Sequence, residues 1–290
     1  MSPSQVATSS LVGREAELRQ VRACLKAGRN VLLEGPVGVG KTQLALSVTA
    51  QLGLQTFRVD GDSRYTEQKL AGWFDPQAVL QKGYSSESFM AGPLAEAMRS
   101  GGVLFINEMN RLPEGVQNIL LPAIDERLLS IPRLGTIQAA KGFLVLATQN
   151  PKEFVATTQL SEALLDRFEL VRLDYQTEDE EKAIVLQALS RRSGAPVSVL
   201  PEILNTVVSG VRATRNDPKI RRGASVRAAI AWAEVAKVFI DDGASLSDAL
   251  QWAAKITLPT RIEWERGTGD PIQRETEFLE RVAADLKKKI

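Results

Sequence analysis

The sequence of 290 residues contains no histidine and only one cysteine, Cys24. A chain without histidine has no Ser-His-Asp triad, no imidazole metal ligand and no histidine general base. A single cysteine excludes an internal disulfide and a cysteine-rich zinc site, and we interpret Cys24 as a small core residue. These absences remove several common classes of hydrolase and metalloprotein from consideration.

The chain also lacks a strong charge imbalance and a long apolar run. Its 36 Lys and Arg residues against 35 Asp and Glu residues give a net charge of +1, so electrostatics offer no reason to expect a nucleic-acid or membrane partner. No apolar run approaches the roughly 20 residues of a membrane span. Residues 1–10 have neither the basic start nor the apolar centre of a signal peptide. We therefore expect a cytoplasmic protein with a frayed N-terminus.

A glycine-rich loop between a short apolar strand and a helix is the strongest signal that is present. GPVGVGKT, residues 35–42, matches the G-x-x-x-x-G-K-[ST] pattern, after an expected strand at 30–34 and before an expected helix at 41–53. Such loops turn backbone N–H groups toward phosphates, and the helix N-terminus adds a positive dipole end. The expected ATP-binding residues are Gly35, Pro36, Val37, Gly38, Val39, Gly40, Lys41, Thr42 and Gln43. The alternative is a glycine-rich turn that binds nothing.

Further apolar strands alternate with helical segments as far as residue 175. The expected strands are 56–62, 103–107, 142–151 and 170–175, and the expected helices are 92–100 and 114–126. This alternation predicts an α/β fold with a parallel sheet covered on both faces. Ligands of such sheets bind at the carboxyl ends of the strands, where Asn107, Glu108 and Asn150 are expected.

The second part of the chain has a helical pattern throughout. A capping box begins at Thr177, and helices are expected over 178–192, 200–211, 226–240, 246–256 and 275–289. We interpret residues 1–175 as the α/β nucleotide-binding core and residues 176–290 as a smaller, all-helical C-terminal lid domain. The core carries an insert at about 60–93 and an expected hairpin at about 126–143, with its turn near Leu134.

Seven short motifs, in this order and spacing over roughly residues 10–260, resemble the AAA+ ATPases of the MoxR family. They are LVGRE (11–15), GPVGVGKT (35–42), INEMNR (106–111), QNILLPAIDER (117–127), ATQNP (147–151), LLDRF (164–168) and GASVR (223–227). The phosphate loop is shared with many unrelated NTPases, whereas ATQNP followed by LDRF is fairly specific to MoxR-like proteins. More weakly, QNILLPAIDE is similar to the CoxD-like branch that matures molybdenum-copper carbon monoxide dehydrogenase.

The resemblance implies a role for each matching residue. The implied roles are general base for Glu108, polar sensor for Asn150, arginine finger toward a neighbouring subunit for Arg167, lid arginine for Arg227, and adenine contacts for Gly13 and Arg14. Each polar residue also has a structural alternative. Glu108 could end a strand, Asn150 could form a turn, Arg167 could pair with Asp166, and Arg227 could be an ordinary helix charge.

The family normally has an acid at the position of Asn107, where it contacts Mg²⁺ through water. An amide keeps the acceptor oxygen but removes one negative charge, and Mg²⁺ retains most of its waters in proteins. With Thr42 and Asn107 as the metal-site residues, we expect Mg²⁺ and ATP to bind, with weaker magnesium affinity. Since Glu108 is retained, we expect a slow but real ATPase.

Three functions remain open at this point. The first is a chaperone-like ATPase ring, expected as a hexamer, that remodels a protein client (possible clients include a metalloenzyme) and works with a separate von Willebrand factor A domain partner. The second is a nucleotide-binding switch or scaffold with weak turnover because of Asn107. The third is a DNA-acting AAA+ motor, which the net charge disfavours. Trp73 and Phe74, in the insert, are expected either to grip a client near a pore or to pack into the core.

Overall fold

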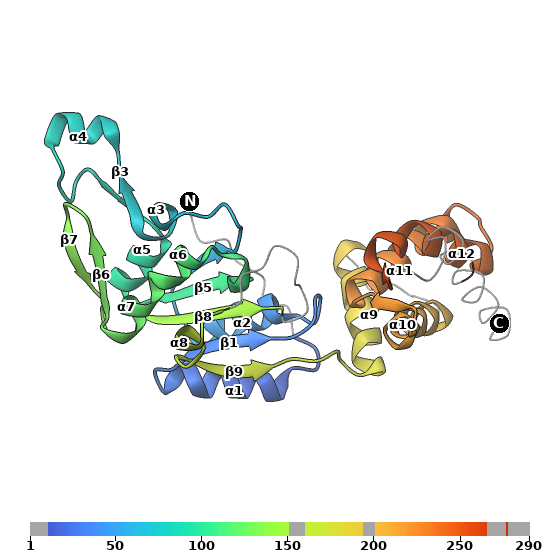
Figure 1. The fold of residues 1–290 in the computed structure, drawn as a ribbon. Helices are drawn as coiled ribbons and strands as arrows, with labels where there is room; N and C mark the ends of the chain where they lie inside the picture. Colours follow the sequence, from blue (N-terminus) through green and yellow to red (C-terminus); the bar gives the residue numbers. More distant parts are fainter. Residues whose placement is uncertain (1–10, 151–159, 194–200, 266–276, 278–290) are drawn as a thin grey trace. The chain divides into compact units, whose positions relative to one another are not determined.

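The computed structural model describes residues 11–150, 160–193, 201–265 and 277 (Figure 1). The expected frayed N-terminus, and all but Glu277 of the helix expected at 275–289, lie outside these residues. The chain divides into two compact units, Met1–Asp174 and Tyr175–Ile290.

A five-stranded parallel sheet forms the centre of the first unit. Its strands, in spatial order, are β2 (Thr56–Asp60), β5 (Val103–Asn107), β8 (Leu144–Gln149), β1 (Asn30–Glu34) and β9 (Phe168–Arg172). The three inner strands are continuous buried apolar runs, because helices cover both faces of the sheet (Figure 1). The predicted parallel α/β fold is confirmed, although β9 begins two residues before the expected strand.

Helices flank this sheet, and one of the expected helices is divided in two. They are α1 (Glu15–Lys26), α2 (Lys41–Gln51), α5 (Pro93–Ser100), η1 (Met109–Arg111), α6 (Glu114–Asn118), α7 (Leu120–Asp125) and α8 (Glu162–Leu165). The single helix expected at 114–126 is divided into α6 and α7. The cause is Pro122, which has no N–H and whose ring crowds the carbonyl of Asn118, four residues earlier. On α1, Cys24 is only half-buried, not a core residue.

Two additions extend together from the first unit (Figure 1). The insert consists of α3 (Glu67–Ala71), β3 (Gly72–Phe74), α4 (Pro76–Lys82) and β4 (Phe89–Ala91), and the hairpin of β6 (Leu128–Ile131) and β7 (Gly135–Gln138). The Arg133 guanidinium of the hairpin turn lies 4.1 Å from the ring centroid of Tyr84 in the insert. Phe74 packs edge-on against Tyr84, at 5.0 Å between ring centroids, whereas Trp73 is 47% exposed. Trp73 and Phe74 of the insert therefore differ in their surroundings.

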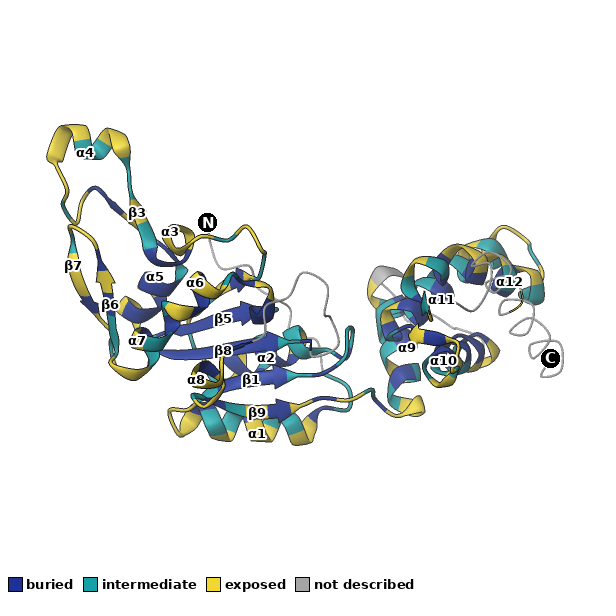
Figure 2. Cartoon of the chain, in the orientation of Figure 1, coloured by how far each residue is buried: buried dark blue, intermediate teal, exposed yellow. Residues whose placement is uncertain are grey.

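The second unit packs four helices around a fully buried Trp232. They are α9 (Glu178–Ser193), α10 (Pro201–Asn216), α11 (Val226–Asp241) and α12 (Leu246–Thr257), followed by η2 (Pro259–Arg261). A Cβ added at Gly210 would lie 2.6 Å from the Trp232 ring, so this packing requires glycine. Figure 2 shows buried residues on the inner faces of these helices. Two short antiparallel strands, β10 (Ile220–Arg222) and β11 (Glu263–Trp264), correct the expectation of an all-helical unit.

Candidate nucleotide-binding site

The glycine-rich loop connects the carboxyl end of β1 to the N-terminus of α2. Gly40 caps α2 with φ +92°, a conformation that favours glycine. A Cβ at Gly35 would lie 2.2 Å from the carbonyl oxygen of Leu173, just after β9. The Lys41 ammonium donates to the carbonyls of Gly35 and Pro36 at 2.5 and 2.8 Å. The lysine is therefore folded over the loop, and Thr42 follows it in the first turn of α2.

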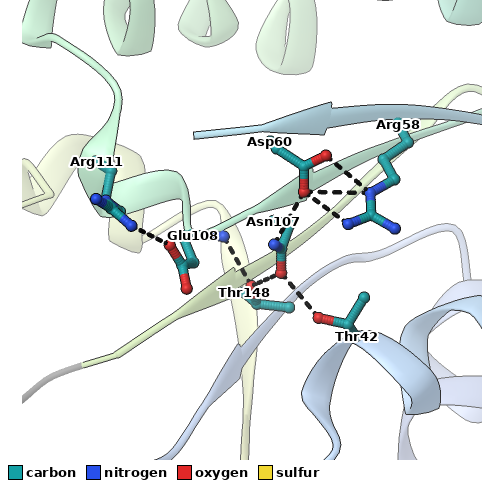
Figure 3. A network of polar contacts seen from close by, with 7 residues as sticks. All are labelled: Thr42, Arg58, Asp60, Asn107, Glu108, Arg111 and Thr148. Atoms are coloured by element: carbon teal, nitrogen blue, oxygen red, sulfur yellow. Dashed lines mark hydrogen bonds and ion pairs between the residues drawn. The ribbon is translucent and has the colours of Figure 1, made fainter. Parts of the chain in front are cut away.

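The side chain of Asn107 lies at the centre of a polar network at the ends of three adjacent strands (Figure 3). Its Oδ1 accepts hydrogen bonds from the hydroxyls of Thr42, at 2.9 Å, and Thr148, at 3.1 Å. Its Nδ2 donates to Oδ1 of Asp60 at 3.0 Å. We call the side chains of Thr42, Asp60, Asn107 and Thr148 the strand-end network.

Asp60, the carboxylate of this network, was not singled out by the sequence analysis. It ends β2 and lies directly opposite Asn107 in the sheet register. Arg58, on the same strand, donates to both of its carboxylate oxygens, with the shortest distance 2.7 Å. Hydrogen bonds from this guanidinium, with a smaller contribution from Asn107, hold the pKa of Asp60 below its usual range. The signal that was available is a polar residue at a strand's carboxyl end, the same signal that pointed to Asn107.

Glu108 adopts a left-handed backbone conformation, with φ +56° and ψ +54°. Such a conformation is unfavourable for a residue with a side chain, and strain of this kind is frequent at functional sites. Three contacts maintain it. The Glu108 N–H donates to the Thr148 hydroxyl at 2.8 Å, its carbonyl accepts from the Arg111 N–H at 2.9 Å, and Gly61 fits closely against that carbonyl. The Glu108 carboxylate pairs with the Arg111 guanidinium at 2.8 Å.

Asn150, the expected sensor, follows β8 directly and is buried, with 5% of its surface exposed. Because β8 lies between β5 and β1, Asn150 leaves the sheet at the same edge as Glu108 and the phosphate loop. Its carbonyl oxygen accepts a hydrogen bond from the buried side chain of Asn110 at 3.3 Å. Beside it, Gln149 donates to Glu34 of β1 at 2.7 Å.

Gly13 and Arg14, expected at the adenine end, precede α1. Gly13 has φ +67°. The guanidinium of Arg14 is buried and donates to two backbone carbonyls, Val39 of the phosphate loop at 3.0 Å and Asp174 at 2.5 Å. Arg14 also pairs with Glu17 at 2.6 Å. These contacts tie the phosphate loop to the last residue of the first unit.

The two expected arginine residues come from elements other than those that form this cluster. Arg167 directly precedes β9, at the amino end of the sheet, and forms an ion pair with Asp125 at 2.6 Å, not with the anticipated Asp166. It also donates a hydrogen bond to the carbonyl of Ala163. Hydrogen bonds to Asp125 raise the pKa of Arg167. Arg227 lies exposed in the first turn of α11, in the second unit.

The oxygen atoms at this site fit a magnesium ion that is bound mainly by a nucleotide. Among the described residues there is no group of three or more His, Cys, Asp or Glu side chains that could hold a metal without a ligand's help. Thr42 and Asn107 instead offer two neutral oxygens side by side. Mg²⁺ prefers oxygen ligands, keeps several waters and commonly takes the rest from phosphates.

Comparison with known proteins identifies the family. The AAA domain of the dynein-related subfamily matches residues 30–168. The uncharacterised protein YojN of Bacillus subtilis is 30% identical over 219 residues, which cover 74% of this chain and 70% of YojN. The chain belongs to the AAA+ family. The gas vesicle ATPase GvpN of Ancylobacter aquaticus is 28% identical to this AAA+ chain over 251 residues, covering 78% of the chain and 68% of GvpN.

Other relatives extend well beyond the matched region. An uncharacterised protein of Staphylococcus haemolyticus is 33% identical over 175 residues, 60% of this AAA+ chain and 66% of that protein. A second one, from Staphylococcus epidermidis, is matched over 62% of its length. The chain thus spans slightly less than two thirds of these staphylococcal proteins.

Solved structures support the same fold. RuvB of Thermotoga maritima superposes with a TM-score of 0.59 and 20% identity, over 86% of this AAA+ chain and 72% of RuvB. NtrX of Brucella abortus, solved in complex with ADP, gives a TM-score of 0.57 and 18% identity, over 93% of the chain and 61% of NtrX. At these identities the likeness is one of fold alone. Among the residues that the structure describes, no helix has the length and apolarity needed to span a bilayer.

Proposed function

We propose that the chain is a MoxR-type ATPase that hydrolyses ATP with Mg²⁺, within an oligomeric ring, to remodel or activate a protein client. One observation carries the proposal: Lys41, Thr42, Asn107 and Glu108 converge at one edge of the sheet. Thr42 contacts Asn107 at 2.9 Å, and Glu108 follows it directly. This is the arrangement that a phosphate loop and a water-activating carboxylate require.

In this proposal each group of the site has a defined task. The phosphate loop and Lys41 bind the β- and γ-phosphates, and Thr42 and Asn107 hold oxygen atoms toward the metal. Bound Mg²⁺ supplies positive charge that offsets the negative charge of the phosphate oxygens. Glu108 accepts a proton from the attacking water, a contribution that is typically ~10²–10⁴-fold in rate. Asn150 orients the same water.

The position of Arg167 supports a shared site and therefore a ring. Arg167 precedes β9, whereas the phosphate loop follows β1, and the two strands run parallel with Asn30 opposite Phe168. Five residues at about 3.3 Å each place Arg167 roughly 16 Å from the loop of its own chain. An arginine this far from the phosphate loop of its own chain could act only on another subunit's site, which supports the proposal of a shared site. We propose a hexamer, in which Arg227 reports nucleotide state to the lid.

The exposed apolar residues of the insert support a protein as the client of the ATPase. Trp73 is 47% exposed and Leu80, on α4, is 88% exposed, and both lie on the segment that extends from the first unit (Figure 2). Exposed large apolar residues on a projecting element are typical of protein contacts. A metalloenzyme client, a von Willebrand factor A domain partner, the CoxD-like branch and a cytoplasmic location stay predictions.

A single-turnover ATP assay tests the proposed ATPase. We expect the parent chain to hydrolyse bound ATP and Glu108→Gln to bind ATP equally well but hydrolyse it ~10²–10⁴-fold more slowly. Glu114→Gln, an exposed change in the first turn of α6, is the matched control and should have the parent rate. Equal hydrolysis by the parent and Glu108→Gln would remove Glu108 from the mechanism.

A nucleotide-dependent switch is the second candidate, and one observation favours it. The Glu108 carboxylate is paired with Arg111 at 2.8 Å, which competes with the activation of water. Nucleotide binding by the parent without measurable single-turnover hydrolysis would select the switch. The likeness to RuvB is one of fold, so it does not favour a DNA motor.

A further inference from the structure

The register of the sheet places Asp60 directly opposite Asn107, on the neighbouring strand β2. The two side chains are joined by a hydrogen bond from Asn107 Nδ2 to Asp60 Oδ1 at 3.0 Å. The resemblance to the MoxR family implies an acid at position 107, where this chain has an amide. A carboxylate therefore lies beside the place where one is missing.

The carboxamide of Asn107 has an oxygen end and a nitrogen end, and its neighbours decide which end faces Thr42. The hydroxyls of Thr42 and Thr148 can each donate or accept, so they are compatible with either orientation. An ionised carboxylate can only accept, so Asp60 requires the nitrogen end. Asp60 is therefore the neighbour that turns Oδ1 of Asn107 toward Thr42, which donates to it at 2.9 Å.

With the neutral side chain of Asn107 as its partner, Asp60 acts through orientation more than through net charge. Arg58 pairs with Asp60 through both carboxylate oxygens, so the two side chains together carry no net charge. Their side chains are 45% and 59% exposed, and solvent screens much of the field of such a pair. The hydrogen bond to Asn107 Nδ2 is directional and is not cancelled in this way. Arg58 in turn fixes the carboxylate for that bond.

We propose that Asp60 is a positioning residue for the magnesium-nucleotide site, because it aims the amide oxygen of Asn107 at Thr42. This inference rests on the proposed binding of Mg²⁺ and nucleotide. It also explains why an amide occupies position 107. An aspartate there would bring a second carboxylate within about 3 Å of Asp60, where like charges repel.

The test is equilibrium binding of a fluorescent ATP analogue to the full chain, titrated with Mg²⁺ and repeated in EDTA. Asp60→Asn offers both a donor and an acceptor, so it no longer selects one orientation of Asn107. We expect it to raise the Mg²⁺ concentration for half-saturation by roughly 2- to 10-fold, the effect of one net hydrogen bond. Affinity in EDTA should not change. Asp62→Asn, an exposed carboxylate paired with Arg64, is the control and should match the parent in both titrations.

The decisive measurement is the same substitution in the Asn107→Asp background. There Asp60→Asn removes a like-charge contact, so we expect it to lower the half-saturating Mg²⁺ concentration instead of raising it. A shift of the same direction in both backgrounds would overturn the inference, as would an unchanged Mg²⁺ titration in the parent background. An equal loss in EDTA would also overturn it, because it indicates a structural role. If the parent itself binds no nucleotide with Mg²⁺, the proposed function fails, and that result is separate from these.

Discussion

Two groups of paired charges, one in each unit, differ in how much of their side-chain surface is exposed to water. In the first unit, Arg58 and Asp60 are 45% and 59% exposed. In the second unit, Glu181 is 1% exposed and pairs with Arg212 at 3.1 Å and Arg215 at 2.8 Å. We call these three residues the ion cluster. Breaking a buried pair leaves an uncompensated charge, whereas an exposed pair contributes little to stability.

The ion cluster anchors the segment that begins α11. Arg215 donates to the carbonyl of Ala224 at 2.8 Å, and its guanidinium lies 3.9 Å from the ring centroid of Tyr175. A Cβ at Gly223 would lie 2.7 Å from the Arg215 backbone, so this packing requires glycine. The exposed Arg227, in the first turn of α11, therefore directly follows a segment that the buried Arg215 holds in place. The comparison teaches that charges of the ion cluster contribute to the stability of the second unit, whereas the exposed pair of Arg58 and Asp60 contributes little to that of the first.

The largest expected effect is on a partly exposed charge. Arg167→Ala should lower steady-state ATP turnover by ~10³–10⁵-fold, because an arginine finger stabilises charge in the transition state. ATP affinity and the melting temperature should change little, since the ion pair of Arg167 with Asp125 is partly exposed and solvent screens it. Arg29→Ala, which removes an exposed pair with Glu169, is the control and should retain turnover. Parent-level hydrolysis by Arg167→Ala would contradict the shared site.

The next effect should appear in stability instead of turnover. Glu181→Ala leaves Arg215 buried without its partner, and we expect the second unit to lose about 3–5 kcal/mol of unfolding free energy. Urea unfolding measures this loss. Glu169→Ala breaks an exposed pair and should cost less than about 1 kcal/mol. Equal losses of unfolding free energy in Glu181→Ala and Glu169→Ala would show that burial does not make the ion cluster more important for stability than an exposed pair.

The smallest effect concerns Thr148, the buried hydroxyl of the strand-end network, whose other members are partly buried or exposed. Thr148→Val keeps the shape but leaves the N–H of Glu108 without its acceptor, and it should cost about 1–3 kcal/mol. Thr49→Val is the matched control. The Thr49 hydroxyl is equally buried and donates only to carbonyls of its own helix, so its removal should cost less. Chemical denaturation measures the unfolding free energy of both variants. Equal losses in Thr148→Val and Thr49→Val would argue against a specific role for Thr148.

Much of the fold could be predicted because its inner strands are short apolar runs between clear breaks. The bounds of β1 and β5 agree with the sequence analysis to the residue. The strands β10 and β11 were missed because three and two residues carry no detectable period. The break between α6 and α7 was missed because the helical pattern continues through Pro122, although proline chemistry could have revealed it.

The candidate site residues could be predicted where they belong to a local motif or directly follow an expected strand, as Asn150 does. Lys41 with Thr42, and Asn107 with Glu108, are adjacent pairs whose spacing carries the chemistry. Asp60 and Thr148 flank Asn107 only because β5 lies between β2 and β8. Strand order follows from packing across the whole sheet, and no local spacing encodes it.

The two hydrogen bonds of Arg14 have a mechanical consequence. The Arg14 guanidinium donates one hydrogen bond to the carbonyl of Val39 in the phosphate loop and one to the carbonyl of Asp174, the last residue of the first unit. Because one side chain joins both carbonyls, a displacement of either carbonyl strains the hydrogen bond to the other. Arg14 is therefore a direct mechanical link between the phosphate loop and the point where the chain leaves the first unit.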